Sequence, residues 1–370
     1  MKIICLLDNL KNGIAKLERI SAKNTALPIL NNILISAKKT GITLQATNLE
    51  IAIITLVSGK VEEEGETTVP LKVFSSYLAN ISGERLSLEQ RKTELVISAN
   101  GNKTAIKTLN AEDFPLIPQI KKDPTISLNA HDLRNALAQV VPSVIISETR
   151  PEISGVFFSA KNTFLYLVGT DSFRLAEKKL AIGENTEFSF ILPLRTVDEL
   201  IRLLDAEPEK SAADLVIDHN QILIKTPSFS LISRLIEGNF PAYEQIIPTR
   251  FKTTITLPQQ KLVQAVKLNS FFTSKRSDID LRAVPSEKKL YISSANNEVG
   301  ENSSVINDVV ITGEEIATKF NYRYILLGIS SILGESVNLK FSEEKNTVSK
   351  LVIMSEHDDN FQYIVMPMLN

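Results

Sequence analysis

Cysteine is almost absent from this sequence. Its 370 residues include one Cys, Cys5, together with three His and no Trp. A lone thiol forms no intramolecular disulfide, and without a pair of Cys residues no structural zinc site of the Cys type is available. The sequence therefore predicts a protein of the reducing cytoplasm.

Long apolar runs are also lacking. The five-residue apolar run near the start ends before Asp8 and is too short for the core of a signal peptide. The apolar stretch at 324–333 contains Ser330 and Ser331 and falls short of the roughly 20 residues of a membrane span. We expect no targeting to a membrane.

The sequence has no large excess of either charge. The 41 Lys and Arg against 43 Asp and Glu give a net charge of −2, which excludes nucleic-acid binding through overall positive charge. With 43% hydrophobic residues and only 14 Gly and 15 Pro, the chain builds cores and is not of low complexity. Its length predicts two or three domains.

One order of features occurs three times along the chain. An amphipathic helix pattern follows a short apolar strand, and alternating strands then end in turns at Asn48, Asp171 and Asn296. A second helix opens at Pro70, Pro193 and Asn321, and Pro115, Pro241 and Pro367 follow at equal steps of 126 residues. We therefore predict three tandem α+β domains, each with two helices packed on antiparallel sheets, at residues 1–122, 126–245 and 247–370.

Positive charge gathers on the predicted helices. Their six spans carry ten basic and five acidic residues, so that the rest of the chain is acidic. The spans are 8–20, 71–81, 131–141, 194–204, 259–269 and 322–332. None has a dense basic cluster or interleaved aromatic residues, which argues against base reading. The excess of basic residues has two explanations. Lys and Arg favour solvated helix faces, or the helices make weak contacts with nucleic-acid phosphates that do not depend on base sequence.

The sequence lacks the common motifs of catalysis. The strings GxxxxGK[ST], GxGxxG, HExxH and GxSxG are missing, and we expect no catalytic residues, no cofactor and no metal site. Two weaker hypotheses stay open: a metal-dependent phosphoesterase that uses His357, Asp358 and Asp359, and a protein-only scaffold that binds peptides. Asp278 and Asp280 alternate along the chain and could hold a hard cation, although a solvated face explains them as well.

Five motifs in order resemble the beta subunit family of bacterial DNA polymerase III, the sliding clamps. They are LPIL at 27–30, TDSFRLA at 170–176, GNFPAYEQIIP at 238–248, KFNYRY at 319–324 and YIVMPM at 363–368. The resemblance implies a non-catalytic processivity factor, a head-to-tail homodimer that closes as a six-domain ring around duplex DNA. Twelve helices of about 10 Å each would line a hole of roughly 35 to 40 Å.

The resemblance also implies a hydrophobic pocket for short peptides of the polymerase, the clamp loader and repair polymerases. Aliphatic and Met side chains suit varied peptides. The positions that match it are Ile153, Thr170, Ser172, Phe173, Arg174, Leu175, Pro241, Ile246, Asn321, Tyr324, Val348, Ile364, Val365, Met366, Pro367 and Met368. Ser172 and Phe173, Gln245 and the terminal Leu369 and Asn370 depart from the family pattern, which leaves the preferred peptide open.

DNA contacts and a dimer interface follow from the same resemblance. The expected DNA-contacting residues are Lys23, Asn24, Lys72, Arg150, Arg195 and Arg202. The expected interface residues are Ile106, Phe271 and Phe272, which match apolar interface positions of the family. Exposed paired Phe residues would otherwise be unusual on a soluble surface.

Overall fold

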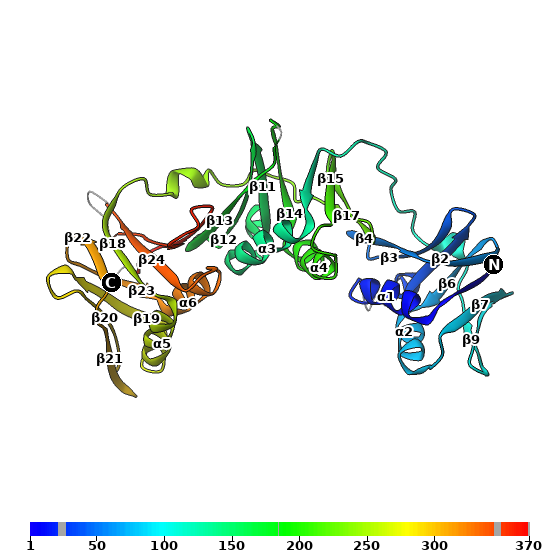
Figure 1. Cartoon of the computed structure of the whole chain (residues 1–370), viewed down its shortest axis with the longest axis horizontal. Helices are drawn as coiled ribbons and strands as arrows, with labels where there is room; N and C mark the ends of the chain where they lie inside the picture. The colour runs from blue at the N-terminus through cyan, green and yellow to red at the C-terminus, as the bar shows by residue number, and fades with distance from the viewer. Residues whose placement is uncertain (21–26, 184, 344–348, 369–370) are drawn as a thin grey trace. The chain divides into compact units, whose positions relative to one another are not determined.

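The protein is a chain of three β-rich modules with two α-helices each. The computed structural model describes residues 1–20, 27–183, 185–343 and 349–368. Each module has a strand and a helix, then four or five strands, a second helix and three final strands (Figure 1). In the described residues the helices are α1 (Leu7–Leu17), α2 (Leu71–Asn80), α3 (Ala130–Val140), α4 (Leu194–Asp205), α5 (Gln259–Ser270) and α6 (Tyr322–Ser330). The predicted threefold repeat of an α+β module is confirmed.

By contacts the chain divides into two compact units. The first holds residues 1–134 and 198–235, and the second holds residues 135–197 and 236–370. These units do not coincide with the three predicted domains because paired strands join neighbouring modules within each unit. The boundaries of the three domains stay a prediction.

The first unit contains two antiparallel sheets. Their strand orders are β5-β1-β7-β8-β9 and β10-β15-β16-β17-β4-β3-β2-β6. In the second sheet β17 of the central module pairs with β4 of the first, with Ile232 opposite Ala52. The strands are β1 (Lys2–Leu6), β2 (Asn32–Lys38), β3 (Gly41–Thr47), β4 (Ile51–Val57), β5 (Gly59–Glu63), β6 (Gly65–Pro70), β7 (Arg85–Arg91), β8 (Glu94–Ala99), β9 (Asn102–Lys107), β10 (Ile126–Asn129), β15 (Ala212–Asp218), β16 (Gln221–Lys225) and β17 (Phe229–Arg234).

The second unit repeats this plan. Its sheets have the orders β14-β11-β12-β13-β26-β25-β24-β18-β22 and β21-β20-β19-β23. Here β13 of the central module pairs with β26 of the last, with Leu175 opposite Ile364. The strands are β11 (Gly155–Lys161), β12 (Phe164–Thr170), β13 (Arg174–Ala181), β14 (Phe188–Pro193), β18 (Phe251–Pro258), β19 (Asp278–Val284), β20 (Lys289–Asn296), β21 (Gly300–Ile306), β22 (Val310–Gly313), β23 (Ile316–Asn321), β24 (Ser336–Ser342), β25 (Leu351–Ser355) and β26 (Phe361–Val365).

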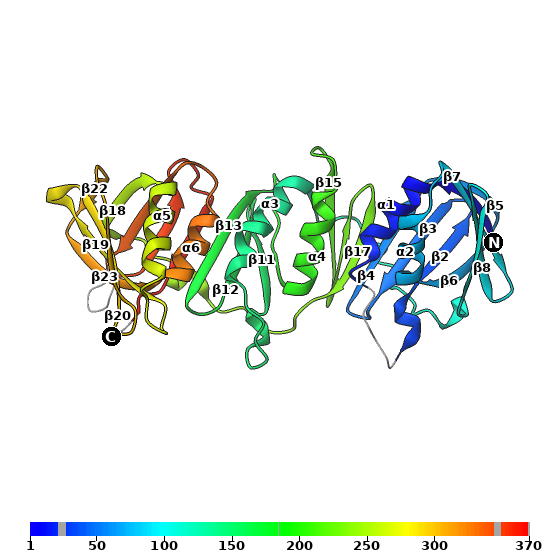
Figure 2. The same ribbon diagram turned by 90° about the horizontal axis from the view of Figure 1, so that it is seen from below.

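The helices bury one face each against these sheets. Leu7, Leu10, Ile14 and Leu17 of α1 follow a three- or four-residue spacing and are all buried. In Figure 2 α1 lies beside α2 over β3 and β4, and the contacts of these elements agree. No helix of the described residues is long and apolar enough to span a membrane.

Two helix ends differ from the predicted spans by two or three residues, and the other ends differ by one residue at most. The first helix ends at Leu17 and not at residue 20, and α6 ends at Ser330 and not at residue 332. The Ile20 amide donates to the Leu17 carbonyl, and the Ile332 amide donates to the Ile329 carbonyl. Each bond joins residues three apart and closes a tight turn where the pattern predicts more helix. Arg19, counted among the helical basic residues, therefore lies beyond α1.

Gly328 gives α6 its close approach to β26. A Cβ atom at this position would lie 2.5 Å from Cδ1 of Tyr363, whose ring is fully buried. We expect Gly328→Ala to lower the free energy of unfolding by about 1 to 3 kcal/mol through overpacking, although Ala is the better helix former. The urea midpoint measures this. Ser330→Ala, at an exposed position of the same helix, serves as the control, and equal midpoints for both variants would contradict the packing argument.

Candidate functional site

The turn between β12 and β13 is held by its own side chains. Thr170 Oγ1 donates to the carbonyl of Arg174 at 2.7 Å, and Asp171 Oδ1 accepts from the amides of Phe173 and Arg174 at 2.9 Å each. Ser172 adopts the left-handed conformation with φ 77°. This Asx-type turn leaves the Phe173 side chain 62% exposed at the tip. An apolar ring is thus offered to solvent on a rigid support.

Arg174 ties this turn to α6 and β26. Its Nε lies 2.9 Å from Asp171 Oδ2, and its guanidinium carbon lies 4.6 Å from the centre of the Tyr324 ring. Its Nη1 also donates to the Tyr363 hydroxyl at 3.4 Å. Burial alone would lower the pKa of Arg174, but Tyr363 and Asp171 raise it above its ordinary value. The charge of Arg174 therefore holds three elements in place.

The end of the described chain runs along the same turn. Beyond β26 the Met366 amide donates to the Phe173 carbonyl at 2.9 Å, and the Met368 amide donates to the Lys319 carbonyl at 2.8 Å. Met366, Pro367 and Met368 are all half-buried. Two flexible Met side chains are consequently available beside the exposed Phe173.

An apolar cluster lies on one face of the β13–β26 joint. Val168, Leu175, Tyr243, Val352 and Ile364 are its buried members, and Phe240 and Ile247 of the segment that leads into β18 pack against it. The Phe157 and Phe240 rings stack with centroids 4.6 Å apart. Burial raises the pKa of the Tyr243 hydroxyl well above its ordinary value, with Glu177 adding to the shift.

Most residues of the predicted peptide pocket gather around this joint. Thr170–Leu175, Tyr324 and Ile364–Met368 are joined by the contacts just described, and Pro241 and Ile246 lie in the covering segment beside Tyr243. Ile153 is buried in a short 3-10 helix (Pro151–Ile153), and Arg150 before it donates to Ser172 Oγ at 2.8 Å. Asn321 uses its side chain to cap α6 by accepting from the Arg323 amide. Val348, Leu369 and Asn370 lie outside the described residues.

The predicted DNA-contacting residues fall into two groups. Lys72 on α2 and Arg195 on α4 are exposed, and neither has an ion-pair partner within the described ranges. Arg202 instead donates to Glu199 and to the carbonyls of Ala15 and Lys16 at the end of α1. Arg150 is likewise engaged by Glu152 and Ser172. Lys23 and Asn24 lie outside the residues that the structure describes.

The predicted interface residues differ in their exposure. Phe271, just after α5, is 72% exposed, whereas Phe272 is half-buried near Gly300 at the start of β21. Ile106 on β9 is only 7% exposed and lies opposite Leu95 in the ladder with β8. Ile106 therefore lies on the buried face of the edge strand β9.

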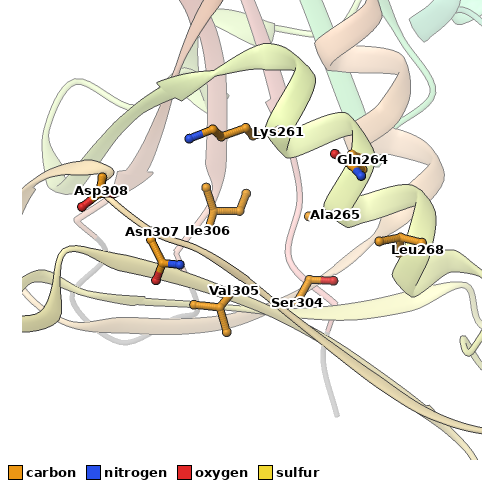
Figure 3. Close-up of a pocket in the computed structure, with 9 residues that line it drawn as sticks. All are labelled: Lys261, Gln264, Ala265, Leu268, Ser304, Val305, Ile306, Asn307 and Asp308. Atoms are coloured by element: carbon orange, nitrogen blue, oxygen red, sulfur yellow. The ribbon is translucent and has the colours of Figure 1, made fainter.

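A groove in the last module was not predicted from the sequence. It has a volume of about 520 Å³ and lies between α5 and β21 (Figure 3). Its lining residues are Lys261, Gln264, Ala265, Leu268, Ser304, Val305, Ile306, Asn307 and Asp308. The available signal was Val305, an exposed β-branched residue on a strand otherwise rich in polar residues. Leu268 is exposed as well, so both walls offer apolar surface.

The candidate metal ligands have other partners. Lys319 Nζ lies 3.2 Å from Asp278 Oδ2 and 3.5 Å from Asp280 Oδ2, and Lys178 Nζ lies 2.8 Å from Asp358 Oδ2. Throughout the described ranges, no group of three or more His, Cys, Asp or Glu is placed to hold a metal ion. Asp278, Asp280 and Asp358 are thus each paired with a lysine.

Comparisons with known proteins agree over the whole length. The N-terminal, central and C-terminal domain models of the DNA polymerase III beta subunit match residues 1–118, 127–242 and 244–369. The chain belongs to the DNA polymerase III beta subunit family. Its function is accordingly that of a DNA polymerase III processivity clamp, an accessory subunit of the polymerase.

Individual relatives are distant in sequence but close in fold. The beta sliding clamp of Bacillus subtilis is 26% identical over 99% of both chains, and that of Staphylococcus aureus is 26% identical over 95% of this chain and 94% of its own. The solved sliding clamp from Bacillus subtilis has a TM-score of 0.93 at 25% identity and covers 100% of this chain and 99% of its own. The solved beta subunit from Thermotoga maritima has a TM-score of 0.90 at 25% identity and the same coverage of both chains.

The Lys178–Asp358 pair should shape the dependence of stability on pH. Partial burial would raise the pKa of Asp358, but hydrogen bonds from Lys178 and from the Asn360 amide hold it below its ordinary value. A depressed folded-state pKa stabilises the protein above the unfolded-state pKa of about 3.9, and this contribution is lost as the pH falls through the folded-state value.

We therefore expect Lys178→Met to raise the pKa of Asp358 and to cost about 1 kcal/mol at pH 7, with a smaller cost at pH 3. Carboxyl-carbon NMR gives the pKa, and urea midpoints at the two pH values give the stability. Lys225→Met, at an exposed lysine, is the matched control. An Asp358 pKa that does not move would rule out the pairing.

Proposed function

We propose that two copies of this chain close head to tail into a ring that encircles duplex DNA and slides along it without catalysis. The observation that supports this proposal most is the match of all three modules, in order, to the domains of the beta subunit family. A head-to-tail contact joins two different surfaces and closes into a ring when its rotation allows. We infer a location in the cytoplasm, because a ring that encircles chromosomal DNA acts where that DNA lies.

The two surfaces that would meet are the edge strands β9 and β21. Each is the last strand of its sheet, so its outer backbone groups are available for pairing with another chain. Lys103 and Lys107 on β9 and Glu298 and Glu301 at β21 are exposed and have no ion-pair partners in the described part of the chain. Opposite charges therefore favour the pairing of unlike edges. Phe271 and the groove between α5 and β21 would be covered by it.

The proposed DNA contact is weak and diffuse. Among the predicted contacts that the structure describes, Lys72 and Arg195 are the basic residues without an ion-pair partner, and Lys23 and Asn24 are retained as candidates. Scattered phosphate contacts hold a ring near the backbone without fixing its register, so it is enclosure that keeps the ring on DNA. Arg150 and Arg202 would contribute less because protein partners already occupy their guanidinium groups.

The peptide site proposed at the β13–β26 joint would tether partners to the ring. Phe173, Met366 and Met368 supply adaptable apolar contacts over the rigid turn of Thr170–Arg174. The polymerase catalytic subunit, the clamp loader and repair polymerases would each present a short linear peptide with an apolar anchor. Binding of one such peptide holds the polymerase beside its template. The polymerase then has a high effective concentration at the DNA and does not need a strong DNA affinity of its own.

Retention on circular DNA tests the ring. With the clamp loaded on a nicked circular duplex, we expect the protein to stay bound during gel filtration and to be lost once the circle is cut. Phe271→Asp should prevent retention and give a monomer mass in light scattering, because it buries an unpaired charge at the seam. Leu333→Asp, exposed and outside the groove, should behave as the wild type. Equal retention on circular and cut DNA would rule out enclosure.

Binding of the polymerase tests the peptide site. We expect Met366→Glu to weaken binding of the purified polymerase catalytic subunit at least tenfold in surface plasmon resonance, because a charge replaces an apolar contact. Leu333→Glu is the control for added negative charge. The variant should keep its dimer mass and its melting temperature. Unchanged affinity in a folded dimer would place the tether elsewhere.

A further inference from the structure

The turn at the first inter-module joint repeats the turn of the proposed peptide site. Thr47 Oγ1 donates to the Ile51 carbonyl at 3.0 Å, as Thr170 does to Arg174, and Asn48 Oδ1 accepts from the amides of Glu50 and Ile51 as Asp171 does from Phe173 and Arg174. Leu49 has φ 77°, the value found at Ser172. The two turns therefore have the same backbone conformation.

The strands beside the two turns are equivalent as well. Ala52 lies opposite Ile232 in the β4–β17 ladder, where Leu175 lies opposite Ile364 in the β13–β26 ladder. At the end of β17 the Arg234 amide donates to the Glu50 carbonyl at 3.0 Å, and just past β26 the Met366 amide donates to the Phe173 carbonyl at 2.9 Å. Arg234 thus takes the place of Met366, and Glu50 takes the place of Phe173.

A cavity of about 310 Å³ lies at this first joint, entirely within the first unit. Its size falls at the lower end of the range for ligand sites. It is lined by the turn, by the connecting segment Pro115–Pro118 and by β17. The lining residues are Thr47, Leu49, Glu50, Ile51, Ala52, Pro115, Leu116, Ile117, Pro118, Asn220, Gln221, Ile232 and Arg234.

The rim of this cavity offers apolar side chains to solvent. Leu116 is 99% exposed and Leu49 is 49% exposed, while Ile51, Ala52 and Ile232 form a buried floor. In the described residues neither Leu116 nor Ile117 has a partner for its backbone amide. An extended peptide could accept from such amides and cover both leucines.

Charge at the rim restricts the occupant further. The Arg234 side chain and the Glu50 side chain are exposed, and neither forms an ion pair with another described residue. A peptide with an acidic residue for Arg234 and a basic residue for Glu50 would complement both charges. The corresponding positions of the second joint are Met366 and Phe173, so the two sites differ in the peptide that they fit.

We propose that the cavity at the β4–β17 joint is a second peptide-binding site, which takes an extended peptide with an apolar anchor between an acidic and a basic residue. The proposal goes beyond the ring and the tether at β13–β26. It places two sites of different preference on one chain, so that two partners could bind one clamp together.

Fluorescence anisotropy with two defined probes tests this site. One probe is fluorescein-Asp-Gly-Ile-Tyr-Gly-Lys-amide, and the other has Asn in place of Asp. We expect the wild type to bind the Asp probe about threefold more tightly than the Asn probe, the size of effect of one exposed ion pair. Leu116→Glu should lower the affinity for both probes about tenfold or more. Arg234→Glu should reverse the preference, so that the Asn probe binds more tightly than the Asp probe.

Controls separate this site from the other functions. Met366→Glu should leave the affinity for both probes within about twofold, while Leu116→Glu and Arg234→Glu should keep the wild-type melting temperature, dimer mass and retention on circular DNA. Both substituted side chains are exposed, so folding is expected. Absence of saturable binding to the wild type, unchanged affinity in Leu116→Glu, an unaltered preference in Arg234→Glu or loss of binding in Met366→Glu would each overturn the proposal.

Discussion

Strand pairing between neighbouring modules is the constraint on which the rest of this structure depends. At β4–β17 and at β13–β26 the last strand of one module completes the sheet of the module before it. A backbone ladder leaves each buried N–H and C=O satisfied, and breaking it would expose both edges. Each compact unit contains one such joint, which explains why the contacts divide the chain inside the central module and not between modules.

Several basic residues that suggest nucleic-acid binding are used to hold this framework together. Arg150 donates to Ser172 Oγ in the β12–β13 turn, and Arg202 donates to the carbonyls of Ala15 and Lys16 in the last turn of α1, where a positive charge also complements the helix dipole. The count of basic residues on helices therefore overstates the free positive charge. What is left, with Lys72 and Arg195 among it, suits loose contact better than a tight grip.

The repeat, the helices and the turn between β12 and β13 were predictable because each has a local signal. Pro70, Pro193 and Asn321 mark the starts of second helices, and the motif at 170–176 contains the whole set of side chains that builds its turn. Exposure was not predictable in the same way. Ile106 and Phe271 are both apolar, yet only packing decides that Ile106 is buried on the edge strand β9 whereas Phe271 faces solvent. Likewise, the lysine partners of Asp278 and Asp358 come from other strands, Lys319 from β23 and Lys178 from β13, which no sequence spacing indicates.

The two joints show how the exposed side chains of a turn can change without loss of the framework. The turn needs Thr at its first position, Asn or Asp at its second and a tolerated left-handed third residue, and both copies meet these needs through hydrogen bonds to backbone groups. The residues at the tip contribute only backbone groups to those bonds. They are Leu49 and Glu50 in one copy and Ser172 and Phe173 in the other. They are free to differ because the ladder beneath them does not depend on their identity. A duplicated joint of this kind can therefore keep one fold while its two copies come to select different partners.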